Sequence, residues 1–310
     1  MQSEHDNLRS ALEWSLEGHA GEDAGLEMAA AMSWFWIKRG HLGEGRVWLE
    51  RALANEGASP RLTAKALTGL GSITFFQGDY PTTKRFAERS LERSREADSH
   101  AESALSLGLL SVLAFESGDV ERSVQLAREC LDAAAACGEL WRASPALQCL
   151  AYQAMQAGDF DEACRIAQEA LDHCRRKGDT WGIGMCLSDL ALFRVLQGQY
   201  VDAEQLCSEA LAVTRELGDR LLTAFFLSFL AGAQAGQGRH RRAAQLWGAM
   251  HALLDSVGAP LQPSHKMWIG DRFITAAEVS LGTSAFEQAL AEGRAMSLDQ
   301  AVQLATNARP

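Results

Sequence analysis

The sequence of 310 residues is short of proline, with 6, and of tyrosine, with 3, and it has no long apolar run. Scarce proline leaves most of the chain free to form helices, which the abundant alanine, leucine, glutamate and arginine also favour. No uncharged apolar stretch approaches the roughly 20 residues that a membrane-spanning helix needs. The polar start, residues 2–6, does not resemble a signal peptide. We therefore expect a helical, soluble and cytoplasmic protein that does not bind membranes.

Motifs of the common catalytic and metal sites are also missing. No lysine follows a glycine, so the chain has no phosphate-binding loop of the G-x-x-x-x-G-K-[ST] type. The 8 histidines form no H-x-x-x-H or H-E-x-x-H, and the 7 cysteines form no C-x-x-C. We expect no enzyme, no cofactor and no metal site. The cysteines are interpreted as small buried hydrophobic residues in a reducing compartment.

Basic side chains are the scarcer charge, with 29 lysines and arginines against 40 acidic residues and a net charge of −11. An acidic chain repels phosphate backbones, so we expect no direct nucleic-acid binding by this segment. One basic cluster, residues 238–242, could contact an acidic partner. The alternative is a solvated helix start, although cations there oppose the helix dipole. The candidate residues of this cluster are Arg239, Arg241 and Arg242.

A glycine that recurs every 40 residues is the dominant feature of the sequence. A fixed period between about 20 and 50 residues marks a repeat array. An aspartate follows the glycine in several repeats, so we expect the glycine to end one helix with positive φ and the aspartate to cap the next. The glycines form two series that are half a period apart. The first series is Gly78, Gly118, Gly158, Gly198 and Gly238, and the second is Gly138, Gly178, Gly218 and Gly258. Ala97-Asp98 occupies the place where a further member of the second series would fall.

Three positions in each repeat stay small, at spacings of twelve and seven residues. Small side chains there would let two antiparallel helices approach closely. This spacing resembles the tetratricopeptide pattern, although the period of 40 exceeds the usual 34 of that family by about one helical turn. We therefore predict an all-α, right-handed superhelical solenoid of antiparallel helix pairs. The best examples are Ala151, Ala163 and Ala170, and then Ala191, Ala203 and Ala210.

The two ends of the chain depart from the repeat. We expect an N-terminal helix within residues 1–21, about six helix pairs within 22–258, and capping helices within 259–310. A helix over about 265–281 would end at Gly282. Ser284–Glu287 and Ser297–Gln300 each have the spacing of a capping box. A terminal unit must cover the open end of the solenoid core, and this last segment is suited to do so.

The first helix of each pair, which lines the inner side of such solenoids, carries an apolar stripe. One interpretation is a groove for a peptide, a protein partner or a small apolar inducer, anchored by the aromatic residues. The alternative is that these side chains pack on one another as the superhelix tightens. The stripe consists of Trp34, Ile37, Phe75, Val112, Phe115, Tyr152, Met155, Leu192 and Val195, and the equivalent positions elsewhere hold Ser72, Gly232 and Ala235.

More specific patterns appear near the two ends. Residues 4–14, EHDNLRSALEW, resemble the segment that follows the nucleotide-binding and winged-helix modules of large bacterial STAND ATPase regulators. Residues 36–49 are similar to their first repeat, and residues 244–249 and 291–298 to their closing units. The resemblance spans the chain and points to the MalT-like, LuxR-related transcriptional regulators. It implies a tetratricopeptide region that senses a signal and serves as a platform for autoinhibition or self-association.

Two parts of these regulators have no counterpart in the sequence, the phosphate-binding loop and the DNA-reading helix-turn-helix. The resemblance therefore implies a non-catalytic scaffold that binds an inducer or a protein partner, without ATP hydrolysis or DNA binding. The alternative is a stand-alone adaptor that joins proteins without any link to transcription. The reading frame upstream of Met1 would separate these two interpretations.

Overall fold

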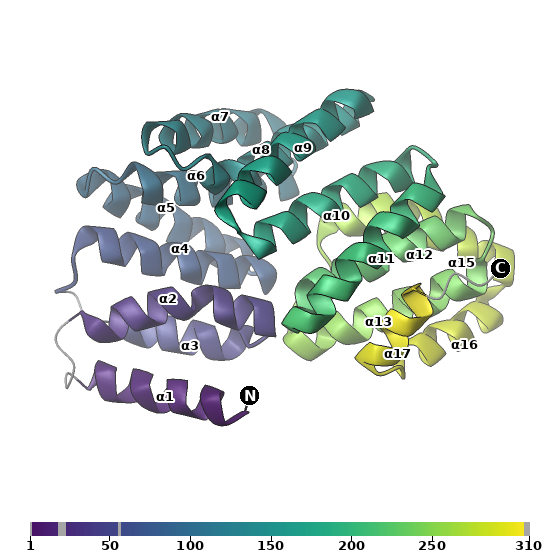
Figure 1. The fold of residues 1–310 in the computed structure, drawn as a ribbon, viewed down its shortest axis with the longest axis horizontal. Coiled ribbons are helices and arrows are strands. Elements are labelled where there is room, and N and C mark those ends of the chain that lie inside the picture. The colour runs from purple at the N-terminus through teal and green to yellow at the C-terminus, as the bar shows by residue number, and fades with distance from the viewer. Residues whose placement is uncertain (1, 18–22, 55–56, 307–310) are drawn as a thin grey trace. The chain divides into compact units, whose positions relative to one another are not determined.

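A computed structural model of the chain describes residues 2–17, 23–54 and 57–306, and every regular element in these residues is a helix (Figure 1). The predicted all-α class is therefore confirmed. The chain divides into two compact units, residues 1–37 with 41–146 (unit 1) and residues 38–40 with 147–310 (unit 2). In the described ranges, no helix is both long and apolar enough to cross a membrane.

Unit 1 is a stack of consecutive helices in which each packs on the next. The helix α6 contacts both α5 and α7, and also contacts α4. In contrast, α5 and α7 contact each other little, so a space remains between these two second helices of successive pairs. The elements of unit 1 are α1 (Gln2–Leu16), α2 (Ala24–Arg39), α3 (Leu42–Ala52), α4 (Pro60–Phe76), α5 (Tyr80–Glu96), α6 (His100–Glu116), α7 (Val120–Ala136) and the 3-10 turn η1 (Leu140–Ala143).

Unit 2 continues the same alternation and then changes. The first helices α10 and α12 contact each other, as α4 and α6 do in unit 1. The elements are α8 (Ser144–Gln156), which begins at the boundary between the units, α9 (Phe160–Lys177), α10 (Thr180–Leu196), α11 (Tyr200–Leu217), α12 (Arg220–Gly236) and α13 (His240–Val257). The closing elements are α14 (Pro263–His265), η2 (Lys266–Ile274), α15 (Thr275–Leu281), α16 (Thr283–Arg294) and α17 (Leu298–Thr306).

The turns between helices follow the predicted Gly-Asp design. The glycines of both series have φ between 65° and 84°, the left-handed conformation that glycine adopts most readily. The side chains of Asp79, Asp119, Asp159 and Asp219 each accept a hydrogen bond from the backbone N–H three residues later. Where the second series lacks its glycine, Asp98 takes the same left-handed conformation, with φ of 48°.

The small positions lie where the two helices of a pair meet. In both alanine-rich pairs all three side chains are buried, including Ala151, Ala163 and Ala170. A pair with other small residues forms hydrogen bonds between its helices: the Ser123 hydroxyl donates to the Ser111 carbonyl at 2.9 Å. The spacing of twelve and seven residues therefore marks close helix–helix contacts, as predicted.

The closing helices pack on α13 through two glycines. A Cβ atom on Gly248 would collide with the Leu290 carbonyl oxygen, and one on Gly293 would collide with the Gln245 carbonyl oxygen. Because glycine has no Cβ, the backbones of α13 and α16 can approach each other directly at these two points. A side chain at either position would push α16 away.

Two helix starts were predicted as capping boxes, and one of them is present. Ser297 and Gln300 form the reciprocal pair of hydrogen bonds, at 2.8 and 3.2 Å. The box at Ser284–Glu287 is wrong, because α16 already begins at Thr283 and Gly282 occupies the capping position without a side-chain bond. The helix expected over about 265–281 is confirmed, with the difference that its first part, η2, is a π-helix. The division into residues 1–21, 22–258 and 259–310 stays a prediction.

Candidate functional site

The apolar stripe predicted on the first helices is largely buried. Only Trp34 is well exposed, at 41%, and Val112 is half-buried. This burial favours the interpretation that these side chains pack inside the protein, and their role in partner binding stays a prediction. The buried members are Ile37, Phe75, Phe115, Tyr152, Met155, Leu192 and Val195.

In unit 2 the stripe is covered by the chain's own π-helical segment η2. The indole ring of Trp268 meets the ring of Tyr152 edge to face, with centroids 4.8 Å apart. The neighbouring Ile269 is fully buried, and a Cβ on Gly232 would lie 3.1 Å from its Cδ1 atom. The same Cβ would lie 3.2 Å from Val195. Stripe positions of α8, α10 and α12 therefore form the seat for Trp268 and Ile269.

A buried carboxyl group lies beside this seat. Asp189 of α10 accepts a hydrogen bond of 2.6 Å from the Tyr152 hydroxyl and bonds of 2.8 and 3.1 Å from the Gln148 side-chain amide. Burial raises the pKa of Asp189 to about 7, and these two hydrogen bonds oppose that shift. Asp189 and Tyr152 are buried and Gln148 is half-buried, so this hydrogen-bonded group is part of the packing beside the stripe.

A buried histidine lies at the start of the same segment. The His265 ring stacks on Phe225 at 4.8 Å and on Phe229 at 5.2 Å between centroids. Burial lowers the pKa of His265 to about 4, so the ring is neutral at physiological pH. Its surroundings are aromatic, which suits a packing role for a neutral imidazole. Among the described residues, no three His, Cys, Asp or Glu side chains gather around a common metal position.

The basic cluster at residues 238–242 ties the last repeat to the closing helices. Arg241 donates two hydrogen bonds, of 2.7 and 2.8 Å, to Glu292 of α16. Arg242 donates to the Leu304 carbonyl of α17 at 2.5 Å, and Arg239 lies 3.4 Å from Glu204 of α11. All three arginines thus have partners within unit 2. Their binding of an acidic partner stays a prediction.

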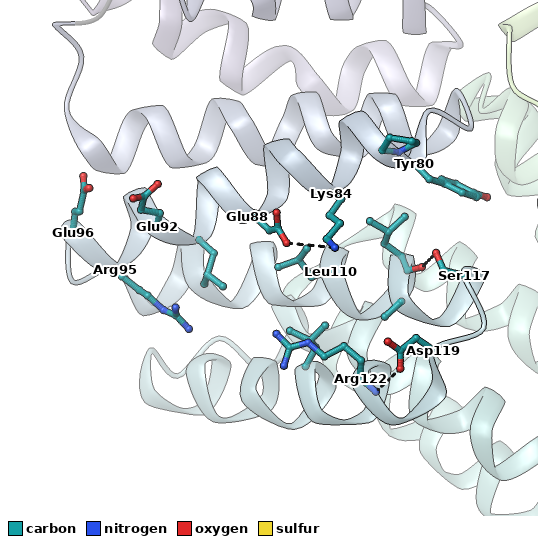
Figure 2. A pocket seen from close by; sticks show the side chains of 15 residues that line it. Tyr80, Lys84, Glu88, Glu92, Arg95, Glu96, Leu110, Ser117, Asp119 and Arg122 are labelled. Atoms are coloured by element: carbon teal, nitrogen blue, oxygen red, sulfur yellow. Dashed lines mark hydrogen bonds and ion pairs between the residues drawn. The ribbon is translucent and has the colours of Figure 1, made fainter.

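An open groove lies in unit 1, between the second helices α5 and α7, and Figure 2 shows it from close by. It encloses about 940 Å³. The exposed surface of α6 forms its floor, because α5 and α7 both pack on α6 without closing over it. Residues of all three helices and of the turn before α7 line the groove.

The floor of the groove is apolar. Leu110 and Leu113 of α6 lie at helical spacing, and Leu91 of α5 and Leu126 of α7 flank them. Each of these leucines is largely buried by its neighbours and presents the remainder of its surface to the groove. With Ala114 they form a continuous apolar base. They occupy a different face of α6 from the stripe residues at positions 112 and 115.

The walls of the groove are charged. On α5, the Lys84 ammonium lies 3.9 Å from the Glu88 carboxylate. Figure 2 shows Arg95 and Arg122 pointing into the groove from opposite walls. The lining also holds four carboxylates, Glu88, Glu92, Glu96 and Asp119. Arg95 forms no ion pair with any described residue, and the Arg122 guanidinium donates to the neutral Gln125 side chain at 2.8 Å. Two cations without an acidic partner therefore face the groove.

One end of the groove touches the stripe. The Tyr80 ring stacks on Phe75, a stripe residue, with centroids 5.6 Å apart. Burial raises the pKa of the Tyr80 hydroxyl to about 12, with a smaller contribution from Glu116. The phenol is therefore neutral and can donate a hydrogen bond at the rim of the groove.

The groove was not predicted from the sequence, because its residues lie on second helices and on the outward face of α6. One signal was available. Residues 80–96 hold five basic and three acidic side chains, although the whole chain is strongly acidic. A local excess of basic residues on one helix of an acidic chain marks a surface that differs from the rest.

Comparison with known proteins identifies the repeat. A family model described as tetratricopeptide repeat matches residues 62–136 and 183–246. The first range covers most of α4 and all of α5, α6 and α7, and thus the whole groove. No curated protein matches the chain significantly. The chain therefore carries a tetratricopeptide-repeat region, and the groove is part of it.

Proposed function

We propose that the protein is a non-enzymatic helical-repeat scaffold that binds a segment of a protein partner in the groove between α5 and α7. The observation that carries this proposal is the apolar floor of α6, which the two neighbouring second helices leave open. Protein interfaces combine an apolar centre with a polar rim, and this groove has both. Tetratricopeptide repeats in general mediate contacts with peptides and proteins.

The groove supports this role better than the stripe does. A binding surface has to offer apolar area to the partner, and most stripe side chains are already buried within the protein. The volume of about 940 Å³ is at the upper end of the range for small-molecule sites. Since the groove is open along its length, it fits a peptide segment better than an enclosed small molecule.

We further propose that the protein acts in the cytoplasm as the sensing region of a bacterial transcriptional regulator of the MalT-like, LuxR-related kind. The end segments at residues 4–14, 36–49, 244–249 and 291–298 support this setting. The reading frame that precedes Met1 tests it. An in-frame nucleotide-binding module would support the regulator, and a stop codon directly before Met1 would favour a stand-alone adaptor.

The groove is tested by selecting peptides from a displayed random 12-residue library on the full-length protein. An Ala114→Trp variant would fill the floor of the groove, so we expect selected peptides to lose at least tenfold in affinity for it. Ala135→Trp places the same ring on an exposed position of α7 outside the groove and should bind as the wild type does. Equal affinity for both variants, with unchanged melting curves, would contradict the proposal.

A further inference from the structure

We propose that α1 is a detachable strap on the N-terminal end of unit 1, held there by the carboxylate of Glu44 in α3. This conformational device is independent of the proposed function, because the residues that hold α1 do not line the groove between α5 and α7. Three features of α1 support it. They are its position at the end of the stack, the small apolar surface that it buries, and the convergence of its polar contacts on one carboxylate.

The first feature is the position of α1, which lies antiparallel to α2 at the end of the stack (Figure 1). Near the end of α1, Leu16 packs so closely on α2 that a Cβ on Gly25 would lie 3.1 Å from its Cα atom. Near the start of α1, the His5 ring meets the Phe35 ring edge to face, with centroids 5.6 Å apart. Release of α1 would uncover this surface of α2, and the contacts among the later helices would remain.

The second feature is the small apolar surface of α1. The leucines at positions 8, 12 and 16 lie at four-residue steps, but Leu12 is the only buried side chain among residues 5–17. Most residues of α6 in the same unit are buried. A helix held by its apolar face buries a wider stripe than this. The docking of α1 therefore depends on its polar contacts more than the docking of α6 does.

The third feature is a carboxylate that takes two side chains of α1 at once. The Arg9 guanidinium donates two parallel hydrogen bonds, of 2.7 and 2.8 Å, to the two oxygens of Glu44. The Nε2 atom of His5 lies 3.2 Å from Oε1 of the same carboxylate. The hydrogen bond from Arg9 lowers the pKa of Glu44, so the carboxylate is ionised at neutral pH. The bidentate form is among the strongest that such a pair can take.

The surroundings of Glu44 strengthen this contact. Its side chain is only 18% exposed, and partly buried pairs are screened by salt less than exposed ones. The His5 ring stacks on the His41 ring, with centroids 4.5 Å apart, and this fixes the imidazole beside the start of α3. A further ion pair, between Glu13 and Arg51, is longer at 3.8 Å and joins two exposed side chains, so it contributes little. A single substitution at Glu44 thus removes the contacts of both Arg9 and His5.

Hydrogen–deuterium exchange of the full-length protein tests the strap. Glu44→Gln keeps the shape of the side chain and removes its charge, and it should accelerate exchange in residues 5–16 at least about tenfold. Exchange reports release because a helix of this length is marginal in water once it has left its neighbours. Residues 60–136 should exchange as in the wild type. Arg9→Gln should produce a smaller increase, since His5 keeps its contact with Glu44.

Glu50→Gln is the matched control, since it removes the same charge from the same helix. Glu50 is exposed and pairs with Arg46 within α3 at 3.0 Å, so this substitution should leave exchange in residues 5–16 unchanged. Salt gives a second readout. Raising sodium chloride from about 0.05 M to about 0.5 M shortens the Debye length and should accelerate exchange of α1 in the wild type. The same change should affect Glu44→Gln less, because the ion pair is already absent.

Two results would overturn this inference. Equal exchange in residues 5–16 for Glu44→Gln and Glu50→Gln would show that the carboxylate does not hold α1. Faster exchange of Glu44→Gln throughout residues 5–16 and 60–136, by the same factor, would show that α1 opens only together with the rest of unit 1. Neither result bears on the groove, whose test is the binding of displayed peptides to Ala114→Trp.

Discussion

Two apolar surfaces of this protein differ in what covers them. The stripe of unit 2 is covered by Trp268 and Ile269, which the chain supplies from its own π-helical segment η2. The floor between α5 and α7 in unit 1 is left open as a groove of about 940 Å³. Both surfaces consist of apolar residues at helical spacing. The difference teaches that periodicity identifies an apolar face, whereas a distant segment of the chain decides whether that face is available.

The polar groups near the two surfaces differ in the same sense. Beside the covered stripe, Asp189 is fully buried and its hydrogen bonds come from within the protein. Around the open groove, Arg95 and Arg122 are exposed and form no ion pair with the part of the chain that the structure describes. Polar groups that already have hydrogen-bond partners within the protein form few new hydrogen bonds with a bound partner. Hydrated charged groups without an ion-pair partner can form new ones.

The largest effect is expected from removing the side chain that covers the stripe of unit 2. We expect Trp268→Ala to lower the free energy of unfolding by about 3–5 kcal/mol, because a large buried ring is replaced by a cavity over Tyr152. Urea denaturation followed by circular dichroism measures this loss. The neighbouring Met267→Ala, at a side chain that is 49% exposed, should change the value by less than about 0.5 kcal/mol. Equal effects of the two substitutions would contradict the assigned cover.

A second test concerns the close packing of α13 and α16, in the same closing part of the chain as the cover. Gly293→Ala would place a methyl group against the Gln245 carbonyl, and we expect a loss of about 1–3 kcal/mol or more. As a control, Gly43→Ala in α3 meets open space and should stabilise the protein by up to about 1 kcal/mol through helix propensity. Thermal unfolding of both variants tests this, and an unchanged melting temperature for Gly293→Ala would show that α16 is not held as described.

The pH dependence of stability sharpens the contrast between satisfied and unmatched charges. Burial raises the pKa of Asp189 to about 7, above its value in the unfolded chain. Between about pH 4 and 7 the folded protein therefore binds one proton more than the unfolded chain does. The contribution of Asp189 to the free energy of unfolding falls as the pH rises through that range. Asp189→Asn should remove this loss. From pH 4.5 to pH 8, the free energy of unfolding of the variant should therefore rise relative to that of the wild type by on the order of 2–4 kcal/mol.

Urea midpoints at these two pH values measure that effect. A pH-independent difference for Asp189→Asn would show that Asp189 does not titrate between the folded and unfolded states.

The smallest predicted effect concerns the turn that joins α5 to α6 and thus sets the wall of the groove against its floor. Asp98 has φ of 48°, where the other repeats have glycine. Asp98→Gly should stabilise the protein by about 0.5 kcal/mol, since the relief of backbone strain exceeds the added entropy of the unfolded chain. Asp98→Ala should destabilise it by a similar amount. Chemical denaturation of the pair gives the sign, and the same sign for both would rule out strain at this turn.

The turns and the helix pairs could be predicted from the sequence because their causes are local. Glycine at 40-residue spacing provides the left-handed residue, and the following aspartate provides the cap within three residues. The small residues at spacings of twelve and seven report a contact between two adjacent helices. In each case the residues that interact lie within one repeat, so the pattern in the sequence is complete.

The covering of the stripe could not be predicted in this way. Tyr152 and Trp268 are more than a hundred residues apart, and nothing in the composition of residues 263–281 indicates a π-helix. The basic cluster presents the same difficulty, since Arg241 finds Glu292 across an interval of 51 residues. The groove was missed because it depends on the gap between α5 and α7, which is a property of packing.

Hydrogen–deuterium exchange of the full-length protein, with and without a display-selected peptide, tests the central claim most directly. The account predicts added protection in residues 80–96 and 106–126, which form the walls and floor of the groove, and no change in residues 266–274. Protection confined to residues 147–156 and 189–195, accompanied by faster exchange in residues 266–274, would contradict it. That result would mean that the partner displaces η2 from the stripe instead of occupying the open groove.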